Sequence, residues 1–149
     1  MTKMDSFRVK LSPPELAELN RQFPISQGSN QIGSRALEIV KKHFRRVYPN
    51  CSFIPAANGA DLAVAVDGAL PKQYEVKGTA GPSIAWQKLK VSSKPSHDLL
   101  VSGGASVLRV TNVFGEEPVV FELRCGLDFR LEPEPRWCVK PYGDSARRG

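Results

Sequence analysis

Three charged side chains within residues 59–81, "GADLAVAVDGALPKQYEVKGTAG", are of the types that phosphodiester hydrolysis needs. Asp61 precedes an apolar run, while Glu75 and Lys77 lie two residues apart in the next one. Carboxylate oxygens are the ligands that magnesium prefers, and the ion is usually held by only one or two of them. Such an ion activates a bound water, and a nearby lysine can stabilise the charge that develops on the phosphoryl group. The three residues therefore form a candidate site for metal-dependent phosphodiester cleavage.

These side chains can act together only if the chain brings them to one face. Residues 61–67 and 73–79 both alternate apolar and polar positions with a period of two, which predicts two strands. Pairing them as a hairpin centred near Leu70 puts Asp61 opposite Thr79. Because side chains of a strand alternate between its two faces, this pairing places the three charged residues on the same side.

The same residues also admit an ordinary structural interpretation. Glu75 and Lys77 could form an ordinary ion pair on a solvated sheet face, with Asp61 as a turn residue. Three features favour a catalytic site instead. The strands are short and apolar, so the face that carries the charged residues should be covered. Basic clusters lie on both sides of the hairpin in the sequence. In addition, Gly59 and Gly78 flank the acids, which we expect to leave backbone room for a ligand.

Two helices should precede this hairpin. Ser12 is a typical N-cap and Glu15 completes a capping box, which predicts a helix over 13–22. A longer helix over 31–48 has a regular apolar face and is ended by Pro49. That face consists of Ile32, Ala36, Val40, His43, Phe44 and Val47. A histidine in such a row is expected to be packed in the core rather than to act as a ligand.

The elements after the hairpin are less regular. Residues 83–92 suggest a strand, and the segment from Ser93 to Gly103 suggests a capped helix. Residues 106–113 and 118–125 read as a second hairpin around the turn "FGEEP".

Length and composition place these elements in one domain. A chain of 149 residues suits one core, which we expect over 1–140, with a flexible tail over 141–149. Its three cysteines are far apart and odd in number, so they fit neither a disulfide framework nor a zinc site. No apolar run is long enough for a membrane span, and the N-terminus lacks the apolar stretch of a signal peptide. We therefore expect a cytoplasmic location.

The charge balance favours a polyanionic partner. Lysine and arginine number 21 against 15 acidic residues, which gives a net charge of +6. The basic residues gather over 35–46 and 86–97, and each cluster could be either a solvated face or a nucleic-acid footprint. The candidate phosphate contacts are Lys41, Lys42, Arg45, Lys88, Lys90 and Lys94.

An amphipathic helix followed by "GADL" and "EVK", with 13 residues between Asp61 and Glu75, resembles the PD-(D/E)XK nuclease superfamily. "YEVKGTAG" and the later "LRVTNV" look like a branch of it found as the C-terminal domain of larger proteins such as NO VEIN. The resemblance covers about residues 30–124 and implies an α/β fold, with a mixed central β-sheet flanked by helices. By it, Asp61 and Glu75 would hold Mg²⁺, or Mn²⁺ in its place. The backbone carbonyl of Val76 would be a further ligand and Lys77 the catalytic lysine.

Two positions depart from the family's pattern. Ala60 replaces the proline of the motif's name. Many members also have a helix glutamate that contacts the metal or water, and Glu38 is the candidate here. Glu38 lies nearly opposite the apolar face of its helix, beside Lys41 and Arg45, so it could equally be a solvated partner for those bases.

The sequence thus predicts a Mg²⁺-dependent, restriction-type endonuclease that hydrolyses DNA. Two alternatives stay open. One is a nuclease specific for branched DNA, of the junction-resolvase type, and the other is a nucleic-acid-binding module that keeps the fold without turnover. By analogy with nucleases that pair subunits to cut two strands, a homodimer is also expected.

Overall fold

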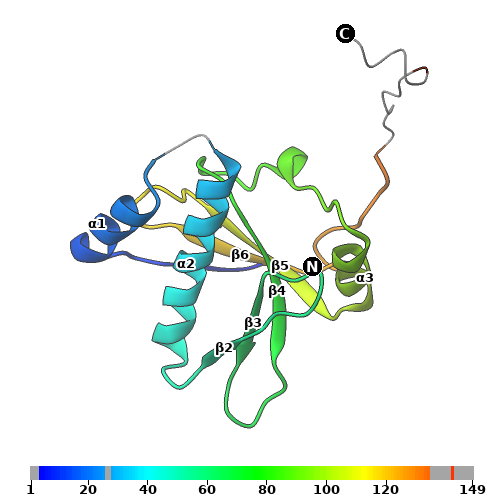
Figure 1. Ribbon diagram of the computed structural model, residues 1–149, viewed down its shortest axis with the longest axis horizontal. Coiled ribbons are helices and arrows are strands. Elements are labelled where there is room, and N and C mark those ends of the chain that lie inside the picture. The colour runs from blue at the N-terminus through cyan, green and yellow to red at the C-terminus, as the bar shows by residue number, and fades with distance from the viewer. Residues whose placement is uncertain (1–3, 26–27, 135–141, 143–149) are drawn as a thin grey trace.

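A six-stranded mixed sheet forms the centre of the protein, and helices cover both of its faces (Figure 1). The computed structural model describes residues 4–25, 28–134 and 142. Its elements in chain order are β1 (Asp5–Arg8), α1 (Pro13–Gln22), α2 (Ser29–Val47), β2 (Ser52–Ile54), β3 (Leu62–Ala65), β4 (Lys72–Gly78), the short 3-10 helix η1 (Trp86–Lys88), α3 (Lys94–Ser102), β5 (Ala105–Thr111) and β6 (Val119–Leu123). The predicted α/β class with a mixed sheet between helices is confirmed.

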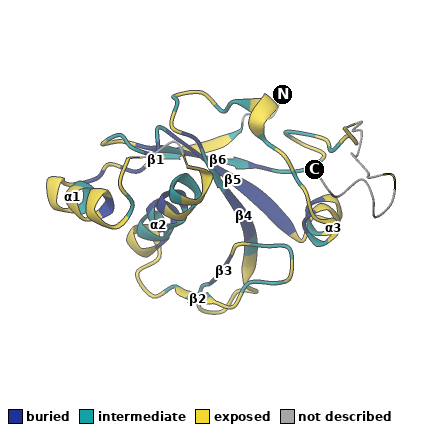
Figure 2. Ribbon diagram, turned by 45° about the horizontal axis from the view of Figure 1, so that its top comes forward, coloured by how far each residue is buried: buried dark blue, intermediate teal, exposed yellow. Residues whose placement is uncertain are grey.

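The strands lie in the order β1-β6-β5-β4-β3-β2. Among the six described strands, only β4 and β5 run parallel. They are joined by a crossover that contains η1 and α3, and the other neighbouring strands are antiparallel. β5 is buried along its whole length and is dark blue in Figure 2, between α2 and α3. The predicted hairpin over 106–113 and 118–125 corresponds to β5 and β6.

The register of β3 on β4 differs from the prediction. Leu62 pairs with Tyr74, and extending this register by one residue puts Asp61 beside Glu75 rather than Thr79. The turn is centred on Gly68, which has φ of +78° and closes it without strain, so the hairpin axis lies two residues earlier than expected. The resulting shift of four residues is even, and the charged side chains still share one face.

The sheet separates two apolar clusters. On one face α2 packs over Tyr74, Val76 and the inward residues of β3 and β5. On the other face α3 and the segments after η1 and β6 cover Val107 and Leu123. Since Tyr74 and Val76 face α2, their neighbours Glu75 and Lys77 face the α3 layer.

The two N-terminal helices follow their sequence signals. The capping box of α1 is present, with Ser12 N donating to Glu15 Oε1 at 2.9 Å and Glu15 N to Ser12 Oγ at 3.3 Å. In α2, His43 stacks on Phe7 with ring centroids 3.7 Å apart, and burial lowers its pKa. The packed role predicted for this histidine is confirmed, whereas Val47, expected on the apolar face, is 50% exposed.

Three elements depart from the expectations. Residues 83–92 do not form a strand, because Ala85 adopts a left-handed conformation with φ of 54° and leads into η1. β1 was not expected, and it pairs with the distant β6. The tail expected over 141–149 lies outside the described residues except for Tyr142. Helix α3 does begin after Ser93 and end at Gly103, as predicted.

Arg35 is a structural residue rather than part of a basic surface. It is fully buried, and its Nε donates to the carbonyl of Val113 at 2.8 Å. Its Nη1 donates to Asn20 and to the carbonyl of Phe23, which links α1 and α2 to the turn after β5.

Two remaining expectations concern the membrane and the cysteines. None of the described helices is long and apolar enough to cross a membrane. Within the described ranges Cys51 and Cys125 are free thiols, and Cys138 lies outside them.

Candidate active site

The start of β3 attaches Asp61 to the backbone of β4. Asp61 N donates to the carbonyl of Tyr74 at 2.8 Å, and Val76 N donates to Asp61 Oδ2 at 2.8 Å. The residue is exposed, and Oδ1 has no hydrogen-bond partner within the described chain. One carboxylate oxygen therefore fixes the side chain, and the other is left for a ligand.

The loop before Asp61 is held by α3. Gly59 has φ of +97°, and a Cβ at this position would lie 2.5 Å from the backbone of Pro95. Ser96 Oγ donates to the carbonyl of Gly59 at 2.8 Å. The expectation that Gly59 leaves room for a ligand is wrong, because the backbone of α3 fills that room.

Gly78 has a similar role on the opposite face of the sheet. A Cβ there would lie 2.9 Å from both Ala36 Cβ and the carbonyl oxygen of Ile32. The missing side chain thus lets α2 approach β4 closely. This glycine, too, makes room for a helix rather than for a ligand.

Glu75 and Lys77 form an ion pair at the edge of the core. Glu75 is 7% exposed, and its Oε1 lies 3.3 Å from Lys77 Nζ. Its Oε2 is buried and has no hydrogen-bond partner among the residues that the structure describes. Burial raises the pKa of Glu75, Lys77 opposes this rise, and the charge of Asp61 adds to it. A buried carboxylate oxygen without a partner is costly unless a cation or proton compensates it.

The donors at this point suit a hard divalent cation. Val76 N–H points toward Asp61, and in an extended strand the carbonyl of the same residue points to the same edge. Two carboxylates and a carbonyl from adjoining positions match the oxygen ligands of Mg²⁺. Among the described residues no group of three or more acidic, histidine or cysteine side chains could hold a metal, so any further ligands would be water or substrate.

Among the described residues, Glu38 does not join Asp61 and Glu75 in a group of three side chains that could hold a metal. It belongs to α2, which packs on the face of Tyr74 and Val76, whereas Glu75 faces the other layer. Its ion pair is with Lys41, at 3.9 Å. The solvated alternative for Glu38 describes this position better than the metal contact does.

The six candidate phosphate contacts lie in two separate layers. On the α2 layer Lys41 and Arg45 stand over the ring of Phe53, at 5.7 and 5.1 Å from its centroid. On the α3 layer, Lys90 pairs with Glu134 and Lys94 with Asp98. Lys42 and Lys88 have no ion pair in the described part of the chain.

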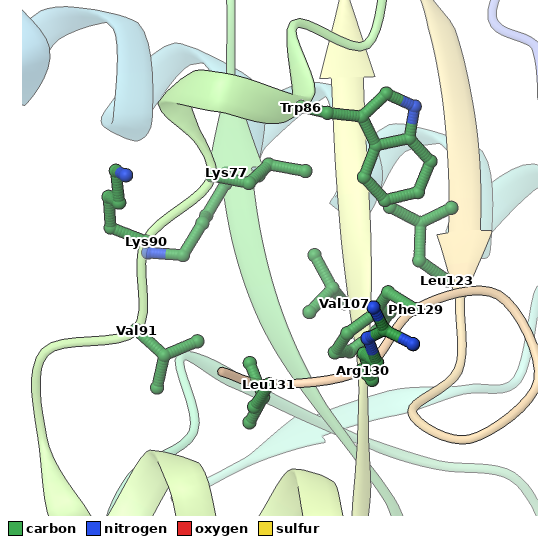
Figure 3. A pocket seen from close by; sticks show the side chains of 10 residues that line it. Lys77, Trp86, Lys90, Val91, Val107, Leu123, Phe129, Arg130 and Leu131 are labelled. Carbon is green, nitrogen blue, oxygen red and sulfur yellow. The ribbon is translucent and has the colours of Figure 1, made fainter. Parts of the chain in front are cut away.

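A small apolar cavity lies next to the site. Its volume is about 140 Å³, and Figure 3 shows Lys77 and Lys90 on one side of it and Trp86 on the other. Phe129 and Leu131 cover it from the segment after β6. Sequence patterns did not indicate this cover, because the segment has no regular period.

Comparisons with known proteins add no assignment: no family model, no curated protein and no solved structure matches this chain.

Proposed function

We propose that this protein is a Mg²⁺-dependent nuclease that hydrolyses DNA phosphodiester bonds. The observation that carries the proposal is Glu75 Oε2, a buried carboxylate oxygen with no hydrogen-bond partner in the described part of the chain. The same carboxylate forms an ion pair with Lys77, and the charge of Asp61 helps to raise its pKa. The resemblance to the PD-(D/E)XK superfamily supports the same assignment of roles.

Asp61, Glu75 and the carbonyl of Val76 would hold the ion, with Mn²⁺ as a substitute. When bound, the ion supplies Lewis acidity at the phosphoryl oxygen and a more acidic water. The protein's own contribution is to fix the ligands in advance. Asp61 is held by Val76 N–H, and Glu75 is held by its burial and by Lys77.

Lys77 acts on the reacting groups. Its side chain is 29% exposed, compared with 10% for that of Glu75, so the ammonium lies at the boundary between core and solvent. From there it can orient the attacking water and stabilise the negative charge of the transition state. Its contact with Glu75 holds the side chain in place.

DNA would be held through its phosphates by the basic residues of both layers, namely Lys41, Lys42, Arg45, Lys88, Lys90 and Lys94. A homodimer would allow both strands of a duplex to be cut.

The test is a metal-dependent cleavage assay on supercoiled plasmid, combined with calorimetric Mn²⁺ titration. Lys77→Ala should keep metal binding and lose cleavage by about two orders of magnitude. Asp61→Asn should lose both, because it removes a charged ligand and little packing. Asp67→Asn, at an exposed aspartate of the β3–β4 turn, is the matched control and should change neither. Cleavage by Lys77→Ala at the parent rate would overturn the assignment.

A nucleic-acid-binding module without turnover is the second candidate. The observation that favours it is the position of Glu38, which leaves the site with two carboxylates. The same titration separates the two functions. A folded protein that binds DNA but neither Mg²⁺ nor Mn²⁺ at the Asp61 and Glu75 site would be such a module.

A further inference from the structure

A basic cleft lies at the carboxyl end of β4, where the strand ends at Gly78. Its volume is about 490 Å³, and it is lined by the start of α2, the end of β4 and part of η1. Figure 1 shows the first turn of α2 and the segment that follows β4 at the same end of the sheet. The charged side chains that line the cleft are Lys77, Lys88 and Arg109, and none of the described acidic residues lines it.

The N-terminus of α2 opens into this cleft through Ser29, Ile32 and Gly33. The helix has 19 residues, and its first turn contains no acidic residue. Its first backbone bond runs from Ile32 N to the carbonyl of Gly28, so the N–H groups of residues 29–31 have no acceptor within the helix. Those N–H groups and the helix dipole together favour an anion.

Arg109 provides a second, independent sign of an anionic ligand. The residue is 3% exposed, its Nε donates to the carbonyl of Ile84, and its Nη1 donates to that of Gly78. Its Nη2 has no hydrogen-bond partner within the described residues, and the side chain lines the cleft. A buried guanidinium with an unused N–H is poised to donate to an oxyanion.

We propose that this cleft binds a phosphate group of the DNA strand, next to the phosphate that is cleaved. The inference rests on the proposed nuclease function, because Lys77 lines the cleft and also pairs with Glu75. The strand would then run from Asp61 past Lys77 toward the first turn of α2. Crevices outside the carboxyl ends of parallel strands are common ligand sites, and β4 and β5 are parallel here.

The first experiment separates anion binding from stability. Ser29→Asp adds an acid to the first turn of α2, which should raise the melting temperature and at the same time weaken DNA binding. Binding of a fluorescent duplex, measured by anisotropy in EDTA, should weaken roughly tenfold, the loss of one charge-assisted contact. Lys88→Ala should weaken it as well, whereas Lys72→Ala, at the exposed other end of β4, should not.

The second experiment identifies the source of the phosphate. Amide NMR shifts of residues 29–31 and Gly81 are followed during titration with the duplex and with inorganic phosphate. Shifts with the duplex alone, or much stronger with it, support the proposal. Equal saturation by inorganic phosphate would overturn it in favour of a free-anion site, and no shift with either would overturn it altogether.

Failure of this proposal is distinguishable from failure of the nuclease function. Both experiments measure binding without metal, so they do not depend on cleavage. If the cleft residues show no NMR shift with the duplex while Lys77→Ala abolishes cleavage, only the proposed path of the DNA strand is overturned. A cleft that binds the duplex in a protein that never cuts would overturn only the nuclease.

Discussion

Glu75 combines two properties that a purely structural ion pair does not need. Its Oε1 is paired with Lys77, yet its Oε2 is buried without a hydrogen-bond partner within residues 4–25, 28–134 and 142. An exposed pair would leave both oxygens hydrated and would contribute little to stability. Burying one oxygen in this way is destabilising in the metal-free protein, and a cation at the site would remove that cost.

This arrangement predicts a specific pH dependence of stability. Because burial raises the pKa of Glu75 above its ordinary 4.5, the folded state keeps this proton to higher pH than the unfolded chain. The proton on Glu75 therefore contributes to the free energy of unfolding fully below pH 4.5. This contribution is lost as the pH rises through the pKa of Glu75 in the folded state. In EDTA, the stability of the parent relative to Glu75→Gln should therefore fall as the pH rises above 4.5 and through the raised pKa of Glu75.

Urea denaturation at several pH values measures this difference. Asp67→Asn is the control, and its stability relative to the parent should not follow the same trend. Adding Mg²⁺ should stabilise the parent increasingly toward high pH, because the ion binds the deprotonated carboxylate. A flat difference between the parent and Glu75→Gln would contradict the raised pKa.

At the scale of elements, local signals were the reliable ones. The capping box at Ser12 and Glu15, and the caps of α3 at Ser93 and Gly103, were predicted from a few neighbouring residues, because each cap is satisfied within its own turn. The shared face of Asp61, Glu75 and Lys77 also followed from strand alternation alone.

Long-range contacts were the ones that local patterns could not predict. β1 forms because it pairs with the free edge of β6, a strand more than 100 residues later in the chain. Arg35 belongs to a basic run in the sequence, yet it is buried by partners on two distant segments, α1 with its C-cap and the turn after β5. The two glycines near the acids were assigned to a ligand, although the structure uses them to bring α2 and α3 close.

The close approach of α2 to β4 is testable at Gly78. A Cβ there would lie 2.9 Å from the carbonyl oxygen of Ile32, so Gly78→Ala must displace the helix backbone. We expect a loss of about 1–3 kcal/mol in the free energy of unfolding. Gly81→Ala is the matched control, since a Cβ there meets nothing within 4 Å. Equal stability of the two variants in urea denaturation would show that the helix does not depend on this contact.

At the scale of the whole molecule, the basic residues are divided between the two helical layers. The side chains of the candidate active site face the α3 layer, which carries Lys88, whereas Lys42 belongs to the α2 layer. A duplex bound at the site therefore contacts both clusters only if it lies across an end or edge of the sheet. The number of phosphates that each cluster neutralises is measurable from the salt dependence of binding.

We expect Lys88→Ala to lower the slope of log affinity against log salt by about 0.9, the value for one phosphate contact on duplex DNA. If α2 also contacts the backbone, Lys42→Ala should lower the slope equally, and combining the two should lower it by about 1.8, because contacts in separate layers are independent. Lys72→Ala is the control and should leave the slope unchanged, since this exposed lysine lies at the far end of β4 from the cleft. Anisotropy titrations in EDTA over a range of salt concentrations provide the slopes of the parent and of these four variants. A slope that changes with Lys88→Ala but not with Lys42→Ala would exclude Lys42 from the DNA contact. The reverse result would place the duplex away from the carboxylates and contradict the proposed site.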